Sequence, residues 1–568
     1  MEITVKCVFG HGGVGKSREL FEEWKLLPNK KKVYMSHSHS FLERQAKRVP
    51  GSRHIYGLEK ICPCLKEDFN PIIDRLHKLK FPNKFLCAVC QDIEAYPTDQ
   101  CPYKKQFKSM PKTLFLPIEY AAHKVMPDYR PKIIAVDDCL LKIKKFPKKS
   151  EIEIWLKILP QNLTIKKYSL KELVEMDDKV FDDVLALLEE EFNIVRTVII
   201  EQVKKNPNDP MLPRLKIVGE DLRVYRQYAR IYGMKKQFAR PYLFYLFDYV
   251  VANPKTKLII IEALPKLLEF LKWQAERYEY ETGNKIRFEC REVKHKPPLP
   301  NSVIYRCYGR RTTAWYPTTT SVTTSKKMKQ IIIKRIKLIL NNLKSQGMEV
   351  NPAFVVPKGA EEDFKAEFPE SKILHFGDLR GKNELEFNNP LFVVGTYNID
   401  RKDLLKEFND LWFPNNPVEN DKLVDEKPHG GRYVYKDERL HYFSWLREGY
   451  EQYQAIMRCR PLNYPRKIYH FGEIPEELPS CIRRTKLWVT LSEGGGILED
   501  RVGWLEEIVK KKGDIQLDTV IKFYQDKYGD TNVTRVRKKI SELLNETDKI
   551  KVRLVDGQIH LIWKDNYN

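Results

Sequence analysis

The sequence predicts an α/β protein of several domains. Short, almost wholly apolar segments recur along the chain, at 3–9, 258–261, 354–356 and 391–395, and such segments are typical of buried parallel strands. Segments with the apolar spacing of amphipathic helices lie between them, for example Asp178 to Phe192. The 568 residues exceed what one hydrophobic core supports, so we expect about three or four domains.

A glycine-rich loop follows the first apolar segment. The strand Ile3–Phe9 runs into the spacing GxxxxGKS, and residues 18–26 continue as a helix. Strand, loop and helix in this order are typical of a Walker A motif, in which backbone N–H groups and the helix N-terminus hold phosphate oxygens. Lys16 would reach the β- and γ-phosphates of ATP, and Ser17 would hold Mg²⁺. We expect the nucleotide to contact Gly10, Gly12, Gly13, Val14, Gly15, Lys16 and Ser17.

A second nucleotide motif is expected at the end of another apolar strand. The segment Pro131–Val136 leads into Asp137 and Asp138. Asp137 would coordinate Mg²⁺ through water, and Asp138 would orient or deprotonate the attacking water. Glutamate is the usual residue at the second of these positions, so the shorter aspartate is a departure.

Five of the eleven cysteines lie between residues 62 and 101. Such clustering in a cytosolic protein indicates a metal site rather than disulfides. Cys87 and Cys90 form a CxxC pair, Cys101 follows, and either Cys62 or Cys64 supplies the fourth ligand, with a slight preference for Cys62. Four thiolates suit zinc or an iron–sulfur cluster, and the spacing alone does not choose between them.

The net charge of +23 favours a polyanionic partner, and nucleic acid is the first expectation. No run of residues is apolar enough to span a bilayer, and the N-terminus has the pattern of a strand rather than of a signal peptide. We therefore expect a cytoplasmic protein without a membrane partner, and a monomer.

The order of these motifs resembles a known family. A Walker A loop, a four-cysteine insertion ending in Cys101-Pro102-Tyr103 and then Asp137-Asp138 are similar to the XPD/DinG-type superfamily 2 iron–sulfur DNA helicases, in an archaeal-like form. The resemblance implies two RecA-like P-loop domains, a 4Fe–4S cluster and a helical arch domain inserted after the second nucleotide motif. It also implies ATP-driven 5′→3′ movement on single-stranded DNA.

Further segments resemble the remaining helicase motifs. Residues 33–39 resemble motif Ia, 258–265 resemble motif III, and 375–383, with Gly381, resemble motif V. Residues 454–461 resemble motif VI, with Gln454 and Arg458 at the expected spacing, Arg460 one residue early and Met457 in place of glycine. Arg458 is the expected arginine finger. Cys139-Leu140 replaces the Ala-His of relatives, so the histidine that links hydrolysis to movement is absent.

The last 70 or so residues are expected to form a separate module. Residues 493–496 (EGGG) are predicted to be a flexible linker. Three predicted helices and a β-hairpin with an Asp-Gly turn then resemble a winged helix. The third helix begins with basic residues that would meet DNA, although many winged helices instead bind proteins: Arg535, Arg537, Lys538 and Lys539.

These observations predict an ATP-dependent DNA helicase or translocase acting on single-stranded and duplex DNA. The alternative is a nucleic-acid-binding regulatory protein that uses ATP as a switch without processive unwinding. The expected domains are a first RecA-like domain (1–55, 105–145 and 253–270), an iron–sulfur insertion (56–104), an arch-like insertion (146–252), a second RecA-like domain (271–492) and a winged-helix domain (497–568).

Overall fold

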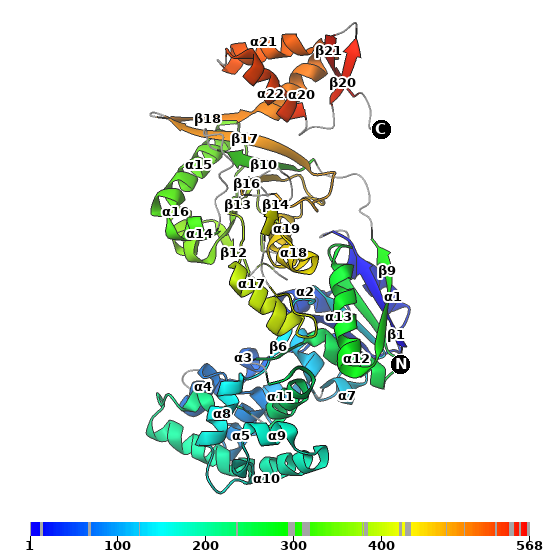
Figure 1. Cartoon of the computed structure of the whole chain (residues 1–568), viewed down its shortest axis with the longest axis vertical. Helices are drawn as coiled ribbons and strands as arrows, with labels where there is room; N and C mark the ends of the chain where they lie inside the picture. Colours follow the sequence, from blue (N-terminus) through cyan, green and yellow to red (C-terminus); the bar gives the residue numbers. More distant parts are fainter. Residues whose placement is uncertain are drawn as a thin grey trace. The chain divides into compact units, whose positions relative to one another are not determined.

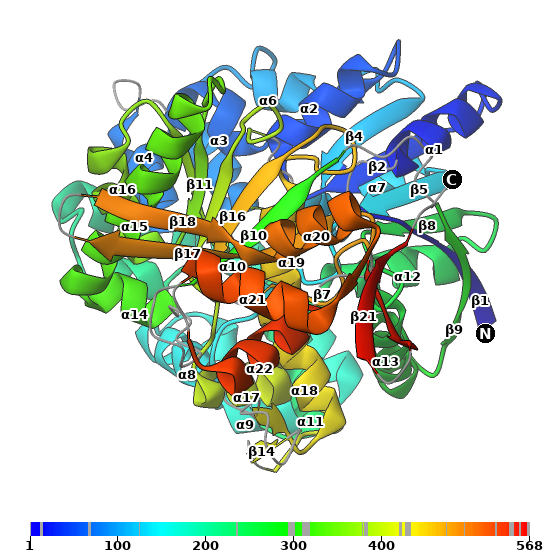
Figure 2. The ribbon, with the colours of Figure 1, turned by 90° about the horizontal axis from the view of Figure 1, so that it is seen from above.

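Figures 1 and 2 show a computed structural model of the chain from two directions at right angles. It describes residues 2–11, 15–65, 70–123, 125–217, 219–234, 237–293, 301–308, 319–377, 379, 384–419, 423–425, 433–472, 474–492, 495–528, 531–544, 550–555 and 558–564. Within these described residues, no helix is long and apolar enough to cross a membrane.

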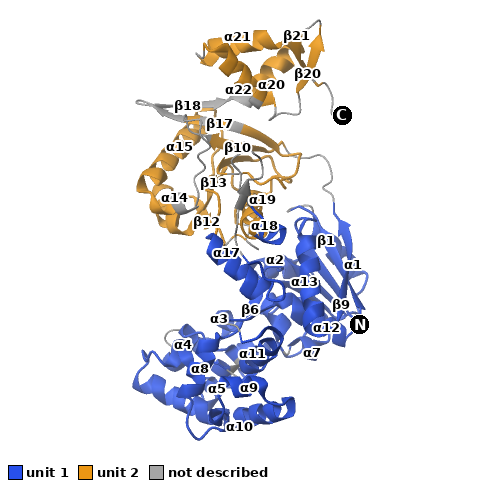
Figure 3. Cartoon of the chain, in the orientation of Figure 1, with its two compact units in different colours: residues 1–11, 15–294, 400–443 blue, residues 12–14, 295–399, 444–568 orange. Residues whose placement is uncertain are grey.

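The chain forms two compact units, which Figure 3 colours separately. The first comprises residues 1–11, 15–294 and 400–443, and the second comprises 12–14, 295–399 and 444–568. Each unit contains one large, mainly parallel sheet, so the predicted α/β class is confirmed.

The first unit is built on a seven-stranded sheet in which every strand pair is parallel. Its inner strands are buried on both faces, which explains their unbroken apolar sequences. In order across the sheet the strands are β3 (Arg53–His54), β4 (Thr113–Pro117), β2 (Lys32–Ser36), β5 (Ile133–Asp137), β8 (Lys257–Glu262), β1 (Glu2–Phe9) and β9 (Lys285–Glu292).

Helices connect these strands, and they extend the first α/β domain beyond its expected end. We expected this domain to finish at residue 270, but β9 pairs with β1 along its whole length and carries the sheet to residue 292. The connecting helices are α1 (Lys16–Lys25), α2 (His39–Lys47), α7 (Val125–Tyr129), α12 (Tyr242–Ala252) and α13 (Leu267–Thr282).

The two insertions predicted for this unit share one hydrophobic core. Buried side chains from the cysteine-rich segment, such as Leu76 and Leu86, belong to the same cluster as Trp155 and Leu188 from the helical segment. A short antiparallel pair, β6 (Ile143–Lys145) and β7 (Ala239–Pro241), begins and ends the helical part. The helices are α3 (Leu58–Ile61), α4 (Pro71–Lys78), α5 (Asn83–Asp92), α6 (Pro102–Lys105), α8 (Lys149–Ile158), α9 (Leu170–Glu175), α10 (Asp178–Lys205) and α11 (Gly219–Tyr232).

A later stretch of chain also belongs to the first unit. Residues 400–443 were expected within the second RecA-like domain, but they pack with residues 1–294. The side chain of Arg277 on α13 donates hydrogen bonds to the carbonyls of Leu411 (2.8 Å) and Trp412 (3.1 Å). This stretch contains α17 (Arg401–Glu407), a π-helical turn (Phe408–Trp412), β14 (Leu423–Asp425), β15 (Tyr433–Tyr435) and most of α18 (Glu438–Ser444).

The second unit has its own seven-stranded sheet, parallel except at one edge, where β17 and β18 are antiparallel. Its strands in order are β12 (Lys372–His375), β11 (Ala353–Val356), β13 (Leu391–Val394), β16 (Lys467–Phe471), β10 (Val303–Tyr308), β17 (Arg483–Ser492) and β18 (Gly495–Asp500). Its helices are α14 (Thr319–Thr324), α15 (Lys326–Ser345), α16 (Glu361–Glu367), a π-helical turn (Trp445–Gly449) and α19 (Tyr450–Met457).

The prediction of a flexible linker at 493–496 is wrong for the two of these residues that the structure describes, Gly495 and Gly496. Gly495 and Gly496 pair with Ser492 and Leu491 in the β17–β18 hairpin, because glycine is compatible with an edge strand. Glu493 and Gly494 lie outside the described residues. The polypeptide therefore passes from the large sheet to the last helices by way of a strand, and residue 497 lies within β18.

The C-terminal elements have a hydrophobic core of their own. The three helices and the hairpin lie where the sequence predicts them, and a short strand between the first two helices, β19, was not predicted. The Asp556-Gly557 turn lies outside the described residues. In chain order the elements are α20 (Arg501–Lys512), β19 (Asp514–Gln516), α21 (Leu517–Tyr528), α22 (Val533–Leu544), β20 (Ile550–Val555) and β21 (Gln558–Trp563), with sheet order β19-β21-β20.

Candidate functional site

The glycine-rich loop begins at the carboxyl end of β1 and leads into α1. The Gly10 N–H donates to the carbonyl of Glu262 at the end of β8 (3.2 Å), which fixes the start of the loop against the sheet. Gly15 has a φ of 94°, a left-handed conformation that favours glycine, and α1 begins at the next residue. The Lys16 ammonium group donates to the carbonyl of Gly10 and lies 3.5 Å from that of His11. Gly12, Gly13 and Val14 lie outside the described residues.

Two side chains of the expected magnesium site are in contact. The Ser17 hydroxyl on the first turn of α1 donates to Oδ2 of Asp137 at the end of β5 (3.2 Å). Burial is the largest influence on Asp137 and raises its pKa, while Lys16 acts in the opposite direction. Parallel strands place their carboxyl ends at one edge of the sheet, which brings these distant residues together.

A tyrosine that the sequence did not single out completes this group. The Tyr34 hydroxyl, from β2, donates to Oδ2 of Asp137 and lies 3.0 Å from the Ser17 hydroxyl. Tyr34 is fully buried, and burial raises its pKa well above the usual value. The sequence placed Tyr34 only within residues 33–39, which resemble motif Ia, and gave it no role of its own.

Asp138 and its neighbours occupy the same edge of the sheet. Asp138 has a left-handed backbone, with a φ of 54°, and its N–H donates to the carbonyl of Ile261 (3.2 Å). The next residue, Cys139, is buried, and its thiol donates to the carbonyl of Asp137 (3.1 Å). Glu262, which only loosely resembled a helicase motif, is 3% exposed at the end of β8 beside Phe9 of β1.

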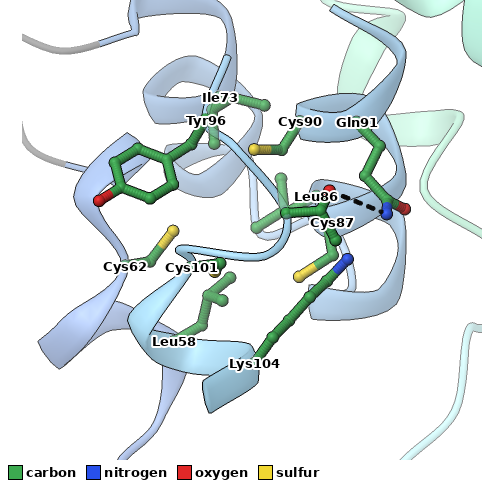
Figure 4. Close-up of a pocket in the computed structure, with 11 residues that line it drawn as sticks. Leu58, Cys62, Ile73, Leu86, Cys87, Cys90, Gln91, Tyr96, Cys101 and Lys104 are labelled. Atoms are coloured by element: carbon green, nitrogen blue, oxygen red, sulfur yellow. Dashed lines mark hydrogen bonds between the residues drawn. The ribbon is translucent and has the colours of Figure 1, made fainter. Parts of the chain in front are cut away.

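Four of the five clustered cysteines line one cavity (Figure 4). Cys62 ends α3, Cys87 and Cys90 lie one turn apart on α5, and Cys101 precedes α6. The Cys64 sulfur instead lies 3.3 Å from the Cys90 sulfur. All five are free thiols. Other residues around the cavity are mainly apolar or uncharged: Leu58, Ile73, Leu86, Gln91, Tyr96, Thr98 and, as the one charged side chain, Lys104.

The chemistry of this cavity fits a thiolate-bound metal group, although its room is small. Burial raises the pKa of Cys62 and Cys64, and it raises that of Cys87 to about 11, so a cation is needed to stabilise the thiolates. The cavity has a volume of about 20 Å³. In the part of the chain that the structure describes, no group of three or more His, Cys, Asp or Glu side chains is arranged to hold a single metal ion.

In the second unit, α19 presents a row of buried polar side chains. Arg458, just after this helix, donates from Nη2 to Gln454 Oε1 (2.7 Å). Glu451 accepts from the N–H of Gly377, which has a φ of 87° (2.7 Å). Gln452 donates to the carbonyl of Gly395 (3.2 Å) and contacts Nε2 of His470 (3.0 Å).

These contacts join two of the segments that resemble helicase motifs. Gly377 belongs to the first and Glu451 lies one turn before the second, so the hydrogen bond between them connects the end of β12 to α19. Arg460 follows with a left-handed φ of 55°. Gly381 lies outside the described residues.

The basic residues of α22 form an exposed face. Arg535, Arg537 and Lys538 are exposed and Lys539 is half-buried, whereas Val536 and Ile540 face the core. Arg537 pairs with Asp518 of α21 (2.7 Å). This exposed pair contributes little to stability, and so Arg537 keeps its capacity to contact an anion.

Comparisons with known proteins give low similarity. No family model matches the sequence, and no curated protein matches it. A solved structure titled "XPD_Helicase" is 14% identical, with a TM-score of 0.37, over 82% of this chain and 92% of that chain. "XPD_APO" is 13% identical, with a TM-score of 0.39, over 82% and 92%. "Structure of S. tokodaii Xpd4" is 12% identical, with a TM-score of 0.36, over 82% and 91%. These scores are too low to establish a shared fold or activity.

Proposed function

We propose that this protein is an ATP-dependent DNA helicase or translocase. It hydrolyses ATP to move on single-stranded DNA, in the 5′→3′ direction, and unwinds duplex DNA. The observation that carries the proposal is the meeting of Lys16, Ser17 and Asp137 at the carboxyl edge of one parallel sheet. A lysine, a hydroxyl and a carboxylate after a glycine-rich loop are the groups that bind a magnesium nucleotide.

Each of these residues has a role in hydrolysis. The loop from Gly10 to Ser17 binds the phosphates, and Lys16 neutralises charge on the β- and γ-phosphate oxygens. Ser17, and Asp137 through water, would hold Mg²⁺, which when bound would stabilise the negative charge on the β- and γ-phosphate oxygens. Asp138, beside Asp137, orients the attacking water or accepts its proton.

The remaining residues proposed to contact nucleotide or DNA belong to the second unit. We assign Arg458 as the arginine finger, with Gln454 and Arg460 as further nucleotide contacts and Gly381 in a nucleic-acid-binding turn. The hydrogen bond from Arg458 to Gln454 supports this assignment, because it holds both side chains in a defined conformation. The two large sheets are the proposed RecA-like domains.

The cysteine cavity is proposed to hold a 4Fe–4S cluster. Cys62, Cys87, Cys90 and Cys101 are the proposed ligands, since these four line the cavity and Cys64 does not. Such a cluster would connect α3, α5 and α6 and so stabilise the insertion. Zinc is the alternative, and metal analysis together with a visible absorption spectrum distinguishes the two.

The C-terminal module is proposed to be a winged helix that binds DNA. The order helix, strand, helix, helix and hairpin supports this fold. Its exposed basic residues Arg535, Arg537 and Lys538, with Lys539 beside them, support DNA as the partner. We further propose that the protein acts as a monomer in the cytoplasm.

A DNA-stimulated ATPase assay tests the proposal. Lys16→Ala should lower the stimulated rate by at least about 100-fold, because it removes a cation that stabilises charge in the transition state. Lys25→Ala is the matched control, since Lys25 lies on the same helix but is exposed and pairs with Glu22. An ATPase rate that does not respond to single-stranded DNA would refute the helicase proposal.

One observation favours a second candidate. Leu140 occupies the position of the histidine that links hydrolysis to movement in the family that the sequence resembles, and its apolar side chain is buried. A nucleic-acid-binding regulatory protein with ATP as a switch would not need that histidine. It would bind DNA tightly, hydrolyse ATP very slowly and leave duplexes intact in a strand-separation assay.

A further inference from the structure

The Tyr34 hydroxyl lies at the centre of the proposed magnesium site. It donates to Oδ2 of Asp137, and the Ser17 hydroxyl lies 3.2 Å from that same oxygen and 3.0 Å from the phenol. Two hydroxyl groups therefore share one carboxylate oxygen. Hydrogen bonds to a charged acceptor are stronger than hydrogen bonds between neutral groups. The bond from the Tyr34 hydroxyl therefore has a large influence on the orientation of the Asp137 carboxylate.

The ring of Tyr34 is fixed by aromatic neighbours. Its centroid lies 5.3 Å from Phe21 and 6.3 Å from Trp24, both on α1. It lies 5.5 Å from Phe115 on β4 and 6.3 Å from Phe41 on α2. A fully buried ring packed in this way has no room to rotate, so the core sets the position of the hydroxyl.

The same packing connects the tyrosine to the phosphate loop. Phe21 and Trp24 follow Ser17 by one and two turns on α1, on the face that contacts Tyr34. The packing of Phe21 and Trp24 against Tyr34 therefore fixes the position of the Tyr34 hydroxyl relative to the Ser17 hydroxyl. The phenol is therefore placed by the core as a hydrogen-bond donor to Asp137.

We propose that Tyr34 is a positioning residue for the magnesium nucleotide. This inference rests on the proposed ATP site. By holding Oδ2 of Asp137, the phenol leaves the second carboxylate oxygen for the ion or its bound water. The Ser17 hydroxyl is then able to leave Asp137 and bind the ion without exposing an unsatisfied carboxylate oxygen.

Nucleotide binding to the full chain tests the role without requiring turnover. The probe is a fluorescent, non-hydrolysable ATP analogue, titrated in excess Mg²⁺ and again in excess EDTA. Tyr34→Phe keeps the ring and removes only the hydroxyl. It should weaken binding about tenfold in Mg²⁺, as expected for a hydrogen bond to a charged group, and change it by less than about twofold in EDTA.

Tyr129→Phe is the matched control. Its hydroxyl is also buried and donates to the carbonyl of Pro111 (2.7 Å), at the opposite edge of the sheet from the phosphate loop. It should lose similar thermal stability but retain the full magnesium effect. Tyr34→Phe with a wild-type magnesium effect, or with equal weakening in Mg²⁺ and EDTA, would overturn the positioning role alone. Wild-type protein that binds no analogue under either condition would overturn the ATP site and this inference with it.

Discussion

Replacing Arg277 with methionine tests how residues 400–443 are held in the first unit. The Arg277 side chain is completely buried and donates to the carbonyls of Leu411 (2.8 Å), Trp412 (3.1 Å) and Ala239 (2.9 Å). It also pairs with Glu281 (2.8 Å), one turn along the same helix. One guanidinium therefore joins α13, β7 and the π-helical turn.

The size of the effect follows from what the substitution leaves behind. Breaking a buried ion pair on one side costs about 3–5 kcal/mol, since the remaining charge has no partner. Glu281 retains the hydroxyls of Tyr228 (2.9 Å) and Tyr232 (2.8 Å), which reduces that part of the loss. The three carbonyls, whose hydrogen bonds with Arg277 are buried, lose a donor. We therefore expect a loss of about 3 kcal/mol, at the lower end of this range.

Hydrogen exchange is the appropriate assay, because a chain with two units is not expected to unfold in one step. Amides of α17 and of the π-helical turn should exchange about 100-fold faster in Arg277→Met. Arg439→Met is the control: this arginine lies in the same segment, but it is partly exposed, pairs with Asp437 two residues away and donates to the carbonyl of Asn416 at an exposed position (3.0 Å). Its loss should change exchange by less than about fivefold. Exchange in Arg277→Met within about threefold of wild type would refute the reasoning.

Two further predictions concern the cysteine cavity and the second sheet. Cys87→Ser should abolish the visible absorption of anaerobically purified protein and its content of about four irons. Cys481→Ser, at an exposed position, should keep both. An iron-free wild-type protein would contradict the proposed cluster. Burial lowers the pKa of His470 from 6.5 to about 3, so between these values the unfolded chain binds a proton that the folded chain does not. The stability of the second unit should therefore fall as pH decreases below about 6.5, by at most about 1.4 kcal/mol per pH unit. His470→Gln should remove the contribution of His470 to the decrease of melting temperature with falling pH. An unchanged pH dependence of the melting temperature in His470→Gln would contradict the lowered pKa of His470.

Local signals were enough to predict much of the fold. Unbroken apolar segments identified β8, β11 and β13, because inner strands of a parallel sheet are buried on both faces, whereas β1 was identified by apolar residues that alternate at first with exposed ones. The loop spacing predicted the turn into α1, where Gly15 adopts the left-handed backbone. The C-terminal helices were equally clear, since Asn532 caps α22 by accepting the N–H of Arg535 (2.9 Å).

The failures arose where a distant contact decides the structure. The two residues Gly495 and Gly496 do not by themselves indicate a strand. They are in a strand because they pair with β17, and a pairing of this kind is not visible in the local sequence. Residues 400–443 contact the first unit through residues such as Arg277, more than 130 positions earlier in the chain than the carbonyl it binds. Arginines on helices are common and mostly exposed, so no local pattern marks this one as a buried donor.

The candidate site shows the same division between local and distant information. The residues that the sequence identified, Lys16 and Ser17, belong to a loop whose spacing is dictated by phosphate geometry. Tyr34 was missed because its importance comes from its direction: one residue shifted along β2, its side chain would face the other side of the sheet, away from α1. A site of this kind is therefore recognised from sequence by the groups that meet the ligand, while the groups that orient them become visible only when the strands are placed side by side.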